Sequence, residues 1–531
     1  MTVRYPVSLL AVMAIAGGLS ACGGGDAGSP TSPTPPVLAA GCTPTATIDL
    51  QPGQTASISA AQAECFRLAP HSGARYALAG FDARAVDGAQ AGPEPYLSGD
   101  ASFLVGDGTG AAPQSAVQLD RMMGPAPVGI RREASADPSS PFRRESPWRV
   151  GERFPVKRFD TGEIATARVT RIMGGRYVFA LVEADKEGHT DRFMSDTEKG
   201  MDVLLRDGIA VLNRTWGAGE PVTSTGSGQL LVVYAAWNPA QGAGVATTWG
   251  APDGSAVGTF VWLNLSVRPG MREDYGMIDV PSYRLKVLAH ELTHAWQQRY
   301  AYTSQPEGPR VTASGSIWAM EGTADLLAME IVRRSLGIGA TSNWGWQDRL
   351  KGQNDAIAYA LQPADARGRL SRGYYDAASF LQDVQLRMVR RGAAADEALA
   401  QVARGAVEGW YGIDGAGLRR TGLATRVRAV LGATWDPADA VLLWTLAQAA
   451  DDRTDAPELN NPVYASVSDD DQPLAWKPAV DELQAGKSFA YQVSRPAGSS
   501  FYVRMKDSGT GGTLALGAGT SGARWMLARI R

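Results

Sequence analysis

The chain has 531 residues, of which 44% are hydrophobic and 20% are charged, and its formal net charge is −3. This length and composition indicate a globular protein of several domains with at least one large core. The nearly balanced charge provides neither the basic surface that attracts nucleic acid nor an acidic tail, so we expect no nucleic-acid partner.

The first 21 residues have the pattern of an export signal. Arg4 supplies positive charge, and the apolar run Val7–Ala16 is too short to remain as a membrane-spanning helix. The sequence Leu19-Ser20-Ala21-Cys22 follows and resembles a bacterial lipobox, which implies cleavage before Cys22 and lipidation of its thiol. An ordinary secretory signal is the alternative, and both interpretations predict an exported protein.

The residue after the lipidated cysteine is Gly23, and by the same resemblance this favours a location at the outer membrane of a bacterial cell envelope. The lipid would anchor the protein to that membrane. Residues 22–40 are rich in Gly, Pro and Ser and are predicted to be a tether between the lipid and the folded part. If Cys22 is lipidated, Cys42 and Cys65 remain as an even pair in an oxidising compartment. We therefore predict a disulfide between them.

Both ends of the chain are predicted to form small all-β sandwich modules. Residues 41–130 contain short alternating segments separated by Gly and Pro, and residues 456–531 repeat part of that pattern. Tyr76-x-Leu78, for example, has a counterpart in Phe501-x-Val503. The two segments resemble accessory domains of the pre-peptidase C-terminal type; a coincidental similarity of glycine-punctuated hairpins is the alternative. Residues 131–147 are predicted to be an exposed linker.

The middle of the chain is predicted to contain both strands and helices. Residues 148–190 have the pattern of a β-meander, with strands at Ile164–Ile172 and Arg176–Val182. Residues 191–455 have the pattern of a compact α+β domain, with a small sheet lobe before a central helix and a helical lobe after it. Strand Gly258–Leu265 is a candidate sheet edge for an extended substrate. The other predicted elements are a helix at Thr197–Trp216, a strand at Gln229–Ala236, and helices at Ile317–Leu336, Tyr374–Arg391, Ala394–Arg404, Leu418–Leu431 and Asp436–Asp451.

The central helix, predicted at Tyr283–Tyr300, carries the sequence H-E-L-T-H from His290 to His294. Because histidines four residues apart lie one helical turn from each other, both imidazoles can bind a single metal ion. Glu291 can reach a water molecule beside that ion. The whole chain has only 4 histidines, so the pattern is improbable by chance. The alternative is a core helix whose histidines are hydrogen-bonded and inert.

A catalytic zinc ion needs a third protein ligand. His71 and His189 lie far upstream in other predicted segments, so we predict a carboxylate. Glu321 can face the two histidines from a returning antiparallel helix. Asp325 lies one turn further on the same face, where it can accept the other N–H of a ligand histidine, and Gly322 would allow the two helices to approach closely. Solvated helix carboxylates are the alternative for both acidic residues.

The H-E-L-T-H sequence and the later Glu321-Gly322-Thr323-Ala324-Asp325 together resemble the gluzincin class of zinc metallopeptidases, and they are most similar to the hyicolysin-type bacterial peptidases. The resemblance covers residues from about 191 to 451. It implies a two-lobed zincin-like catalytic domain that holds one Zn²⁺ ion through His290, His294 and Glu321.

The resemblance also implies how the reaction would proceed. Glu291 would act as general base, taking a proton from water and delivering it to the leaving amine. A tyrosine would stabilise the oxyanion, with Tyr375 as the first candidate and Tyr374 as the second. The alternative for both tyrosines is a contact between helices.

The sequence thus predicts a membrane-anchored zinc metallopeptidase that acts on protein or peptide substrates. One alternative is a binding or scaffold lipoprotein that has the zincin fold without catalysis, although the presence of Glu291 argues against it. Another is a zinc hydrolase of a non-peptide amide or a glycan, because the same activated water attacks any suitable acyl centre.

Overall fold

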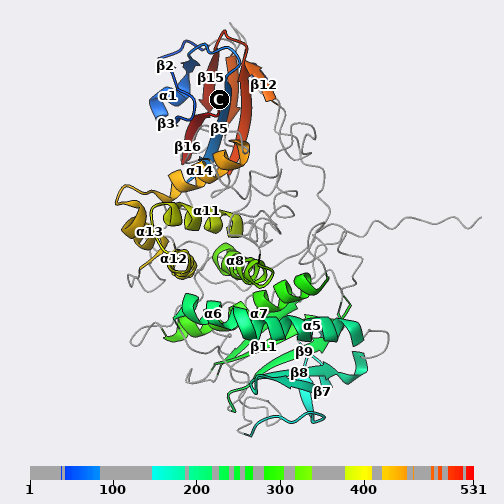
Figure 1. Cartoon of the computed structure of the whole chain (residues 1–531). Coiled ribbons are helices and arrows are strands. Elements are labelled where there is room, and N and C mark those ends of the chain that lie inside the picture. Colours follow the sequence, from blue (N-terminus) through cyan, green and yellow to red (C-terminus); the bar gives the residue numbers. More distant parts are fainter. Residues whose placement is uncertain are drawn as a thin grey trace, which may run out of the picture.

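The computed structural model of the chain contains three β-sheets and a stack of helices between them (Figure 1). This mixture of helices and sheets agrees with the predicted α+β class. The structure describes residues 37–38, 42–83, 146–158, 160–185, 191–217, 227–237, 244–250, 257–266, 280–303, 317–337, 377–409, 421–450, 459, 480–483, 488–492, 500–517 and 522–531.

A six-stranded sheet forms one end of the molecule, with strand order β10-β11-β9-β8-β7-β6. The pairs β8–β9 and β9–β11 are parallel, whereas β6–β7, β7–β8 and β10–β11 are antiparallel. Its strands are β6 (Arg153–Lys157), β7 (Ile164–Met173), β8 (Tyr177–Val182), β9 (Leu230–Ala235), β10 (Gly244–Gly250) and β11 (Val257–Asn264).

The predicted boundary between the meander and the catalytic domain, at residue 190, is wrong. β8 and β9 lie on either side of that boundary and pair directly with each other. Both strands are continuous apolar runs and every residue in them is buried, as expected for parallel strands covered on both faces. The meander is therefore part of the same sheet as the strands that follow it.

Helices α5, α6 and α7 cover one face of this sheet (Figure 1). The predicted helix at Thr197–Trp216 begins earlier than expected and has a π-helical segment in its middle. Aromatic side chains join the layers, since the ring of Tyr234 lies 5.9 Å from that of Phe179 and 6.1 Å from that of Phe193. The elements are α5 (Asp191–Val203), η3 (Leu204–Gly208), α6 (Ile209–Trp216) and α7 (Val280–Thr303), with a short 3-10 turn η2 (Glu183–Asp185) before them.

A second helical layer lies on the other side of α7, as Figure 1 shows. Its helices follow the predicted positions closely, and four of them, α8, α11, α12 and α13, end within two residues of a glycine. They are α8 (Ile317–Ser335), α11 (Ala377–Arg390), α12 (Ala395–Val407), α13 (Leu423–Leu431) and α14 (Pro437–Ala450).

Two five-stranded sheets form the far end of the molecule, next to α14. Their strand orders are β1-β13-β15-β4-β2 and β12-β14-β5-β16-β3. The strands from the first part of the chain are β1 (Val37–Leu38), β2 (Ala46–Ile48), β3 (Thr55–Ile58), β4 (Phe66–Leu68) and β5 (Arg75–Asp82), with a short helix α1 (Ala60–Glu64). Those from its last part are β12 (Val480–Leu483), β13 (Ser488–Gln492), β14 (Ser500–Asp507), β15 (Gly512–Gly517) and β16 (Ala523–Arg529).

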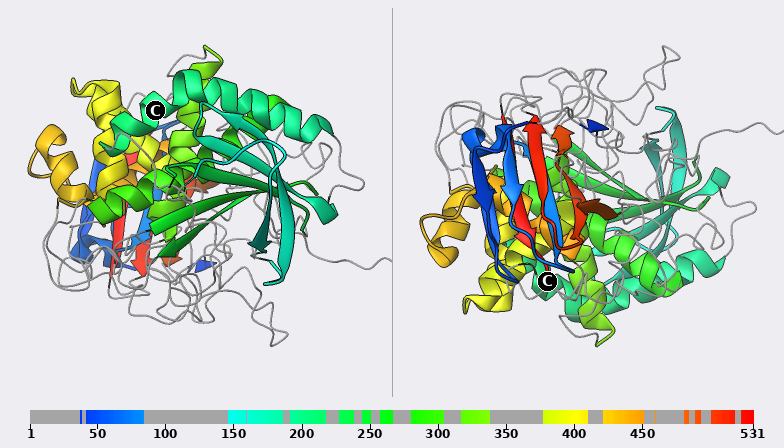
Figure 2. Two further views of the ribbon diagram at one scale, coloured as in Figure 1. Left: turned by 90° about the horizontal axis from the view of Figure 1, so that it is seen from below. Right: turned by 90° about the horizontal axis from the view of Figure 1, so that it is seen from above.

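The prediction of a separate β module at each end of the chain is wrong, because both sheets take strands from both ends. β5 pairs with β14 along one edge and with β16 along the other. The right panel of Figure 2 shows blue and red strands side by side. The similar sequences at the two ends are neighbouring strands of one sandwich, since Leu78 is opposite Val503. Alternating apolar and polar residues predict a half-buried strand, but they do not identify the strand with which it pairs.

The disulfide between Cys42 and Cys65 is confirmed, and it closes a loop that contains β2, β3 and α1. The end of the predicted tether at residue 40 needs correction, because Val37 and Leu38 form strand β1 and pair with β13. Among the described helices, none is both long and apolar enough to cross a bilayer. The signal segment, Cys22 and the predicted linker up to residue 145 lie outside the described residues.

We expect deletion of residues 480–531 to unfold the N-terminal strands. β5 would lose its partners on both edges, and its core would lose Leu483, Leu514 and Trp525. Limited proteolysis with mass spectrometry should find cleavage between residues 42 and 83 in the deletion variant and protection there in the full chain. Equal protection in both proteins would support an independent N-terminal module instead.

Candidate metal centre

Helices α7 and α8 bring the predicted site residues together in the interior of the molecule. His290, Glu291 and His294 lie in the middle of α7, and Glu321 and Asp325 lie one turn apart in the N-terminal half of α8. All five side chains are buried. The two helices pack against each other along their length, so the sequence separation between the two motifs is bridged by one helix–helix contact.

Three possible ligand atoms converge between these helices. Nε2 of His290 lies 3.0 Å from Oε2 of Glu321 and 3.3 Å from Nε2 of His294. Nε2 of His294 lies 3.8 Å from the same Glu321 oxygen. One ligand atom from each residue falls within 4.8 Å of the others, so the group could hold a metal ion. The predicted grouping of His290, His294 and Glu321 is present in the structure.

The other nitrogen of each imidazole is hydrogen-bonded. Nδ1 of His290 lies 2.9 Å from Oδ1 of Asp325, and Nδ1 of His294 lies 2.7 Å from Oε1 of Gln297. A carboxylate oxygen and an amide oxygen accept hydrogen bonds, so each Nδ1 carries the hydrogen. Each Nε2 then directs a lone pair towards the centre. The role predicted for Asp325, fixing a ligand imidazole, agrees with this geometry.

This arrangement fits a cation. In the Nδ1–H tautomers, two imidazole lone pairs and a carboxylate oxygen face one another at 3.0 and 3.3 Å, which is repulsive unless a positive charge lies between them. Two imidazoles and one carboxylate are a ligand set of catalytic divalent-metal sites. The buried Oε2 of Glu291 has no hydrogen-bond partner within the described part of the chain, which leaves it able to bind a further polar group at the site.

The pKa of His290 in the metal-free protein also indicates that positive charge is favoured at this centre. Burial lowers the pKa of His290, but hydrogen bonds to Asp325 and Glu321 outweigh burial and hold that pKa well above its ordinary value. Burial also lowers the pKa of His294, with a net shift downward. A proton on His290 and a metal ion therefore compete for the same place, as is usual for metal ligands.

Glu291 lies against the sheet beside the possible ligands. Burial raises the pKa of its carboxyl to about 8, and the negative charges of Glu321 and Asp325 add to that rise. The charge of His290 and a hydrogen bond from the backbone N–H of Ala246 in β10 oppose it. A nearby divalent cation would lower this pKa, because it favours the charged carboxylate. The edge strand β10 thus contacts the residue that the sequence identifies as the general base.

The predicted edge strand Gly258–Leu265 is wrong, because that segment, β11, lies between β9 and β10. Of the strands that the structure describes, β10 is at this edge, and the sequence analysis did not predict it. Its sequence Gly244-Val245-Ala246-Thr247-Thr248-Trp249 has the composition of a strand, which could have identified it. The two strands form an antiparallel pair over seven residues of each.

Gln297 and Lys286 are site residues that the sequence analysis missed. The amide nitrogen of Gln297 donates to the carbonyl of Met320 at 2.9 Å and to the hydroxyl of Thr323 at 2.6 Å, which turns its oxygen towards His294. Lys286 lies one turn before His290, and its Nζ is 3.5 Å from each oxygen of Asp325. Helical spacing places both side chains beside the histidines and could have identified them.

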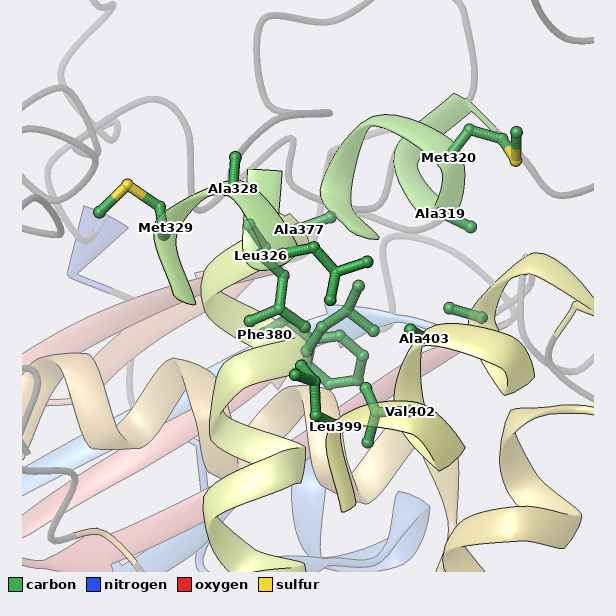
Figure 3. Close-up of a cluster of buried hydrophobic side chains, with 14 of the residues drawn as sticks. Ala319, Met320, Leu326, Ala328, Met329, Ala377, Phe380, Leu399, Val402 and Ala403 are labelled. Atoms are coloured by element: carbon green, nitrogen blue, oxygen red, sulfur yellow. The ribbon is translucent and has the colours of Figure 1, made fainter. Parts of the chain in front are cut away.

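α8 is fixed on its other side by α11 and α12. A Cβ on Gly322 would lie 2.9 Å from the Cβ of Ala377, so the absence of a side chain allows α11 to approach, and not α7 as predicted. Figure 3 shows the apolar contacts of this region, where Leu326 of α8 lies beside Phe380 of α11 and above Leu399 and Val402 of α12.

The other histidines and both candidate tyrosines are not part of the described centre. His71 lies in the β-sandwich, where its Nε2 is 2.7 Å from Oδ1 of Asp49. His189, Tyr374 and Tyr375 lie outside the described residues. No protein-family model matches the chain, and no curated protein matches it either. The geometry of the centre therefore carries the functional argument.

We expect Asp325→Asn to weaken metal binding about 10- to 100-fold, because residues that orient a metal-binding imidazole contribute roughly that factor. The amide has the same shape but carries no charge to stabilise the N–H of His290. Competition with a chromophoric chelator measures the affinity. Glu330→Gln is the control, because it also replaces a carboxylate of α8 by an amide, and Glu330 contacts Arg333 and Arg334. This variant should bind metal as tightly as the unchanged protein. Equal affinity in all three proteins would contradict the orienting role of Asp325.

Proposed function

We propose that the protein is an exported zinc metallopeptidase of the gluzincin type. The observation that carries this proposal is the convergence of His290 Nε2, His294 Nε2 and a Glu321 oxygen, with the Nδ1 atoms turned outward and Glu291 beside them. Two histidines and a glutamate form the ligand set of catalytic zinc in metallopeptidases, in which a fourth position is open.

Zinc in such a site acts as a Lewis acid that polarises the scissile carbonyl and lowers the pKa of a water molecule. Glu291 takes the proton of the attacking water and later delivers it to the leaving amine. Oε2, which has no hydrogen-bond partner among the described residues, is the atom available for this transfer, while the N–H of Ala246 donates to the carboxylate. Asp325 and Gln297 keep the imidazoles in the orientation that binding requires.

The arrangement of layers supports a zincin-like, two-lobed catalytic domain. The six-stranded sheet with α5 to α7 is the first lobe, and α8 with α11 to α14 is the second. The centre lies where α7 and α8 meet, between the two. Among the described strands, β10 is at the edge of the sheet and beside Glu291, so an extended peptide could pair with it through backbone hydrogen bonds. Protein or peptide substrates are therefore the class that we propose.

The N-terminal sequence supports a location in the bacterial cell envelope. The segment Leu19–Cys22 fits lipidation of Cys22 and anchoring to the outer membrane, and residues 23–36 would tether the protein to the lipid. The disulfide between Cys42 and Cys65 also fits an oxidising compartment.

We expect Glu291→Gln to retain zinc and to lose hydrolysis of a casein-like substrate by about 100-fold or more, the usual contribution of a general base. Glutamine has nearly the same shape but does not accept the proton. Zinc content and hydrolysis are measured on the same preparations, with Glu330→Gln as the matched control. Equal hydrolysis by both variants would contradict the role of Glu291.

The same measurement separates the alternatives. Zinc without hydrolysis of peptides in the unchanged protein would favour the scaffold lipoprotein, and hydrolysis of an amide or glycan probe alone would favour the non-peptide hydrolase. No zinc in any preparation would overturn the proposal.

We expect Tyr375→Phe to lower kcat about 100- to 1,000-fold with zinc content unchanged, because an oxyanion donor contributes roughly that factor. Tyr374→Phe removes the neighbouring hydroxyl and should leave kcat nearly unchanged. The two variants are compared by steady-state hydrolysis of one peptide substrate. The reverse result would assign the donor to Tyr374, and full activity in both variants would exclude the two tyrosines.

A further inference from the structure

Gly244, the first residue of the edge strand β10, lies opposite Leu263 of β11. Side chains of directly opposite residues in antiparallel strands project from the same face of the sheet. The side chain of Leu263 lies in the core that the sheet shares with the helices. A side chain at position 244 would therefore project towards α7.

The space on that side of Gly244 is filled by Glu291. A Cβ on Gly244 would lie 2.7 Å from Cγ, 2.7 Å from Oε1 and 3.0 Å from Cδ of Glu291. Carbon atoms in favourable contact are about 3.5–4.0 Å apart, so the carboxylate and a Cβ cannot both occupy these positions. Two residues further along β10, the backbone N–H of Ala246 donates to the same carboxylate.

We propose that Gly244 is a positioning residue for the general base: the lack of a side chain at this position of β10 lets the carboxylate of Glu291 lie against the strand beside the metal ligands. This inference rests on the proposed function for the role of Glu291, whereas the contact itself is a property of the fold. Strand β10 then affects Glu291 in two ways. The backbone N–H of Ala246 donates a hydrogen bond to its carboxylate, and the missing side chain of Gly244 leaves space for that carboxylate.

A side chain at position 244 would displace the carboxylate of Glu291 and leave the paired strands in place. The atoms that would clash belong to the end of a flexible side chain, so rotation of Glu291 costs less than movement of the paired strands. The carboxylate would then leave the N–H of Ala246. The ligands His290, His294 and Glu321 have other partners and would stay in place.

The test measures hydrolysis by Gly244→Ala and thermal unfolding in a double-mutant cycle of Gly244→Ala and Glu291→Ala. We expect Gly244→Ala alone to lower kcat about 10- to 100-fold, since a displacement of about 1 Å at a catalytic group has that effect. KM and the zinc dissociation constant should change by less than about two-fold. Glu291→Ala removes Cγ, Cδ and Oε1, the three atoms that the new Cβ would meet, so in that background Gly244→Ala should have no further effect on thermal unfolding.

Gly405→Ala is the matched control. A Cβ at Gly405 of α12 would also lie 2.7 Å from another atom, but that atom is the backbone Cα of Leu423, which cannot rotate away. We expect this variant to lower the Tm by about 2 °C or more and to leave the kcat of the folded protein unchanged. It separates a general packing defect from a displaced carboxylate.

The cycle is read by thermal unfolding, which does not depend on hydrolysis. Gly244→Ala should lower the Tm in the presence of Glu291 and leave it unchanged in the Glu291→Ala background. If the unchanged protein hydrolyses nothing and this coupling in Tm is present, the contact stands and the proposed function fails. If Gly244→Ala lowers the Tm equally in both backgrounds, or leaves the kcat of an active protein unchanged, the positioning role is overturned.

Discussion

The contact between α7 and α8 depends on hydrogen bonds among buried polar side chains. Asp325 accepts from Nδ1 of His290 at 2.9 Å, and Gln297 links His294 to the backbone of α8 through the carbonyl of Met320. Each of these groups would be costly to bury without its partner. The same hydrogen bonds therefore orient the imidazoles and join α7 to α8.

Charge explains why a cation belongs in this contact. Glu291, Glu321 and Asp325 are three buried carboxylates, and Lys286 is the buried cation beside Asp325. One lysine offsets one negative charge, and a divalent metal ion would offset the other two. Without metal, the raised pKa values of His290 and Glu291 achieve a similar balance with protons. A metal ion at this centre would therefore also help to bury three acidic side chains between two helices.

Much of the centre could be predicted from the sequence because helical geometry is local. The four-residue spacing of His290 and His294, and that of Glu321 and Asp325, fixes which side chains share a face, and the structure agrees. Because the chain has only 4 histidines, the sequence predicts a carboxylate as the third ligand. Gln297 and Lys286 obey the same spacing, but glutamine and lysine on a helix are so common that the pattern alone does not distinguish them.

Non-local pairing could not be predicted. The strands predicted at Ile164–Ile172, Arg176–Val182, Gln229–Ala236 and Gly258–Leu265 are present as β7, β8, β9 and β11. However, β5 lies between β14 and β16, more than 400 residues away in the sequence, and no local pattern shows this. The edge of the large sheet was misplaced for the same reason. The role proposed for Gly244 follows only from the position of Glu291 beside it in space. From the sequence alone, a glycine in a strand indicates little more than a locally less stable strand.

X-ray absorption at the zinc edge of the purified, zinc-loaded protein tests the central claim most directly. The account predicts one zinc ion with two imidazole nitrogens and carboxylate oxygen at about 2.0–2.2 Å, and loss of this signal when His290 and His294 are both replaced by alanine. Zinc bound with unchanged ligands and affinity in that double variant would contradict the account.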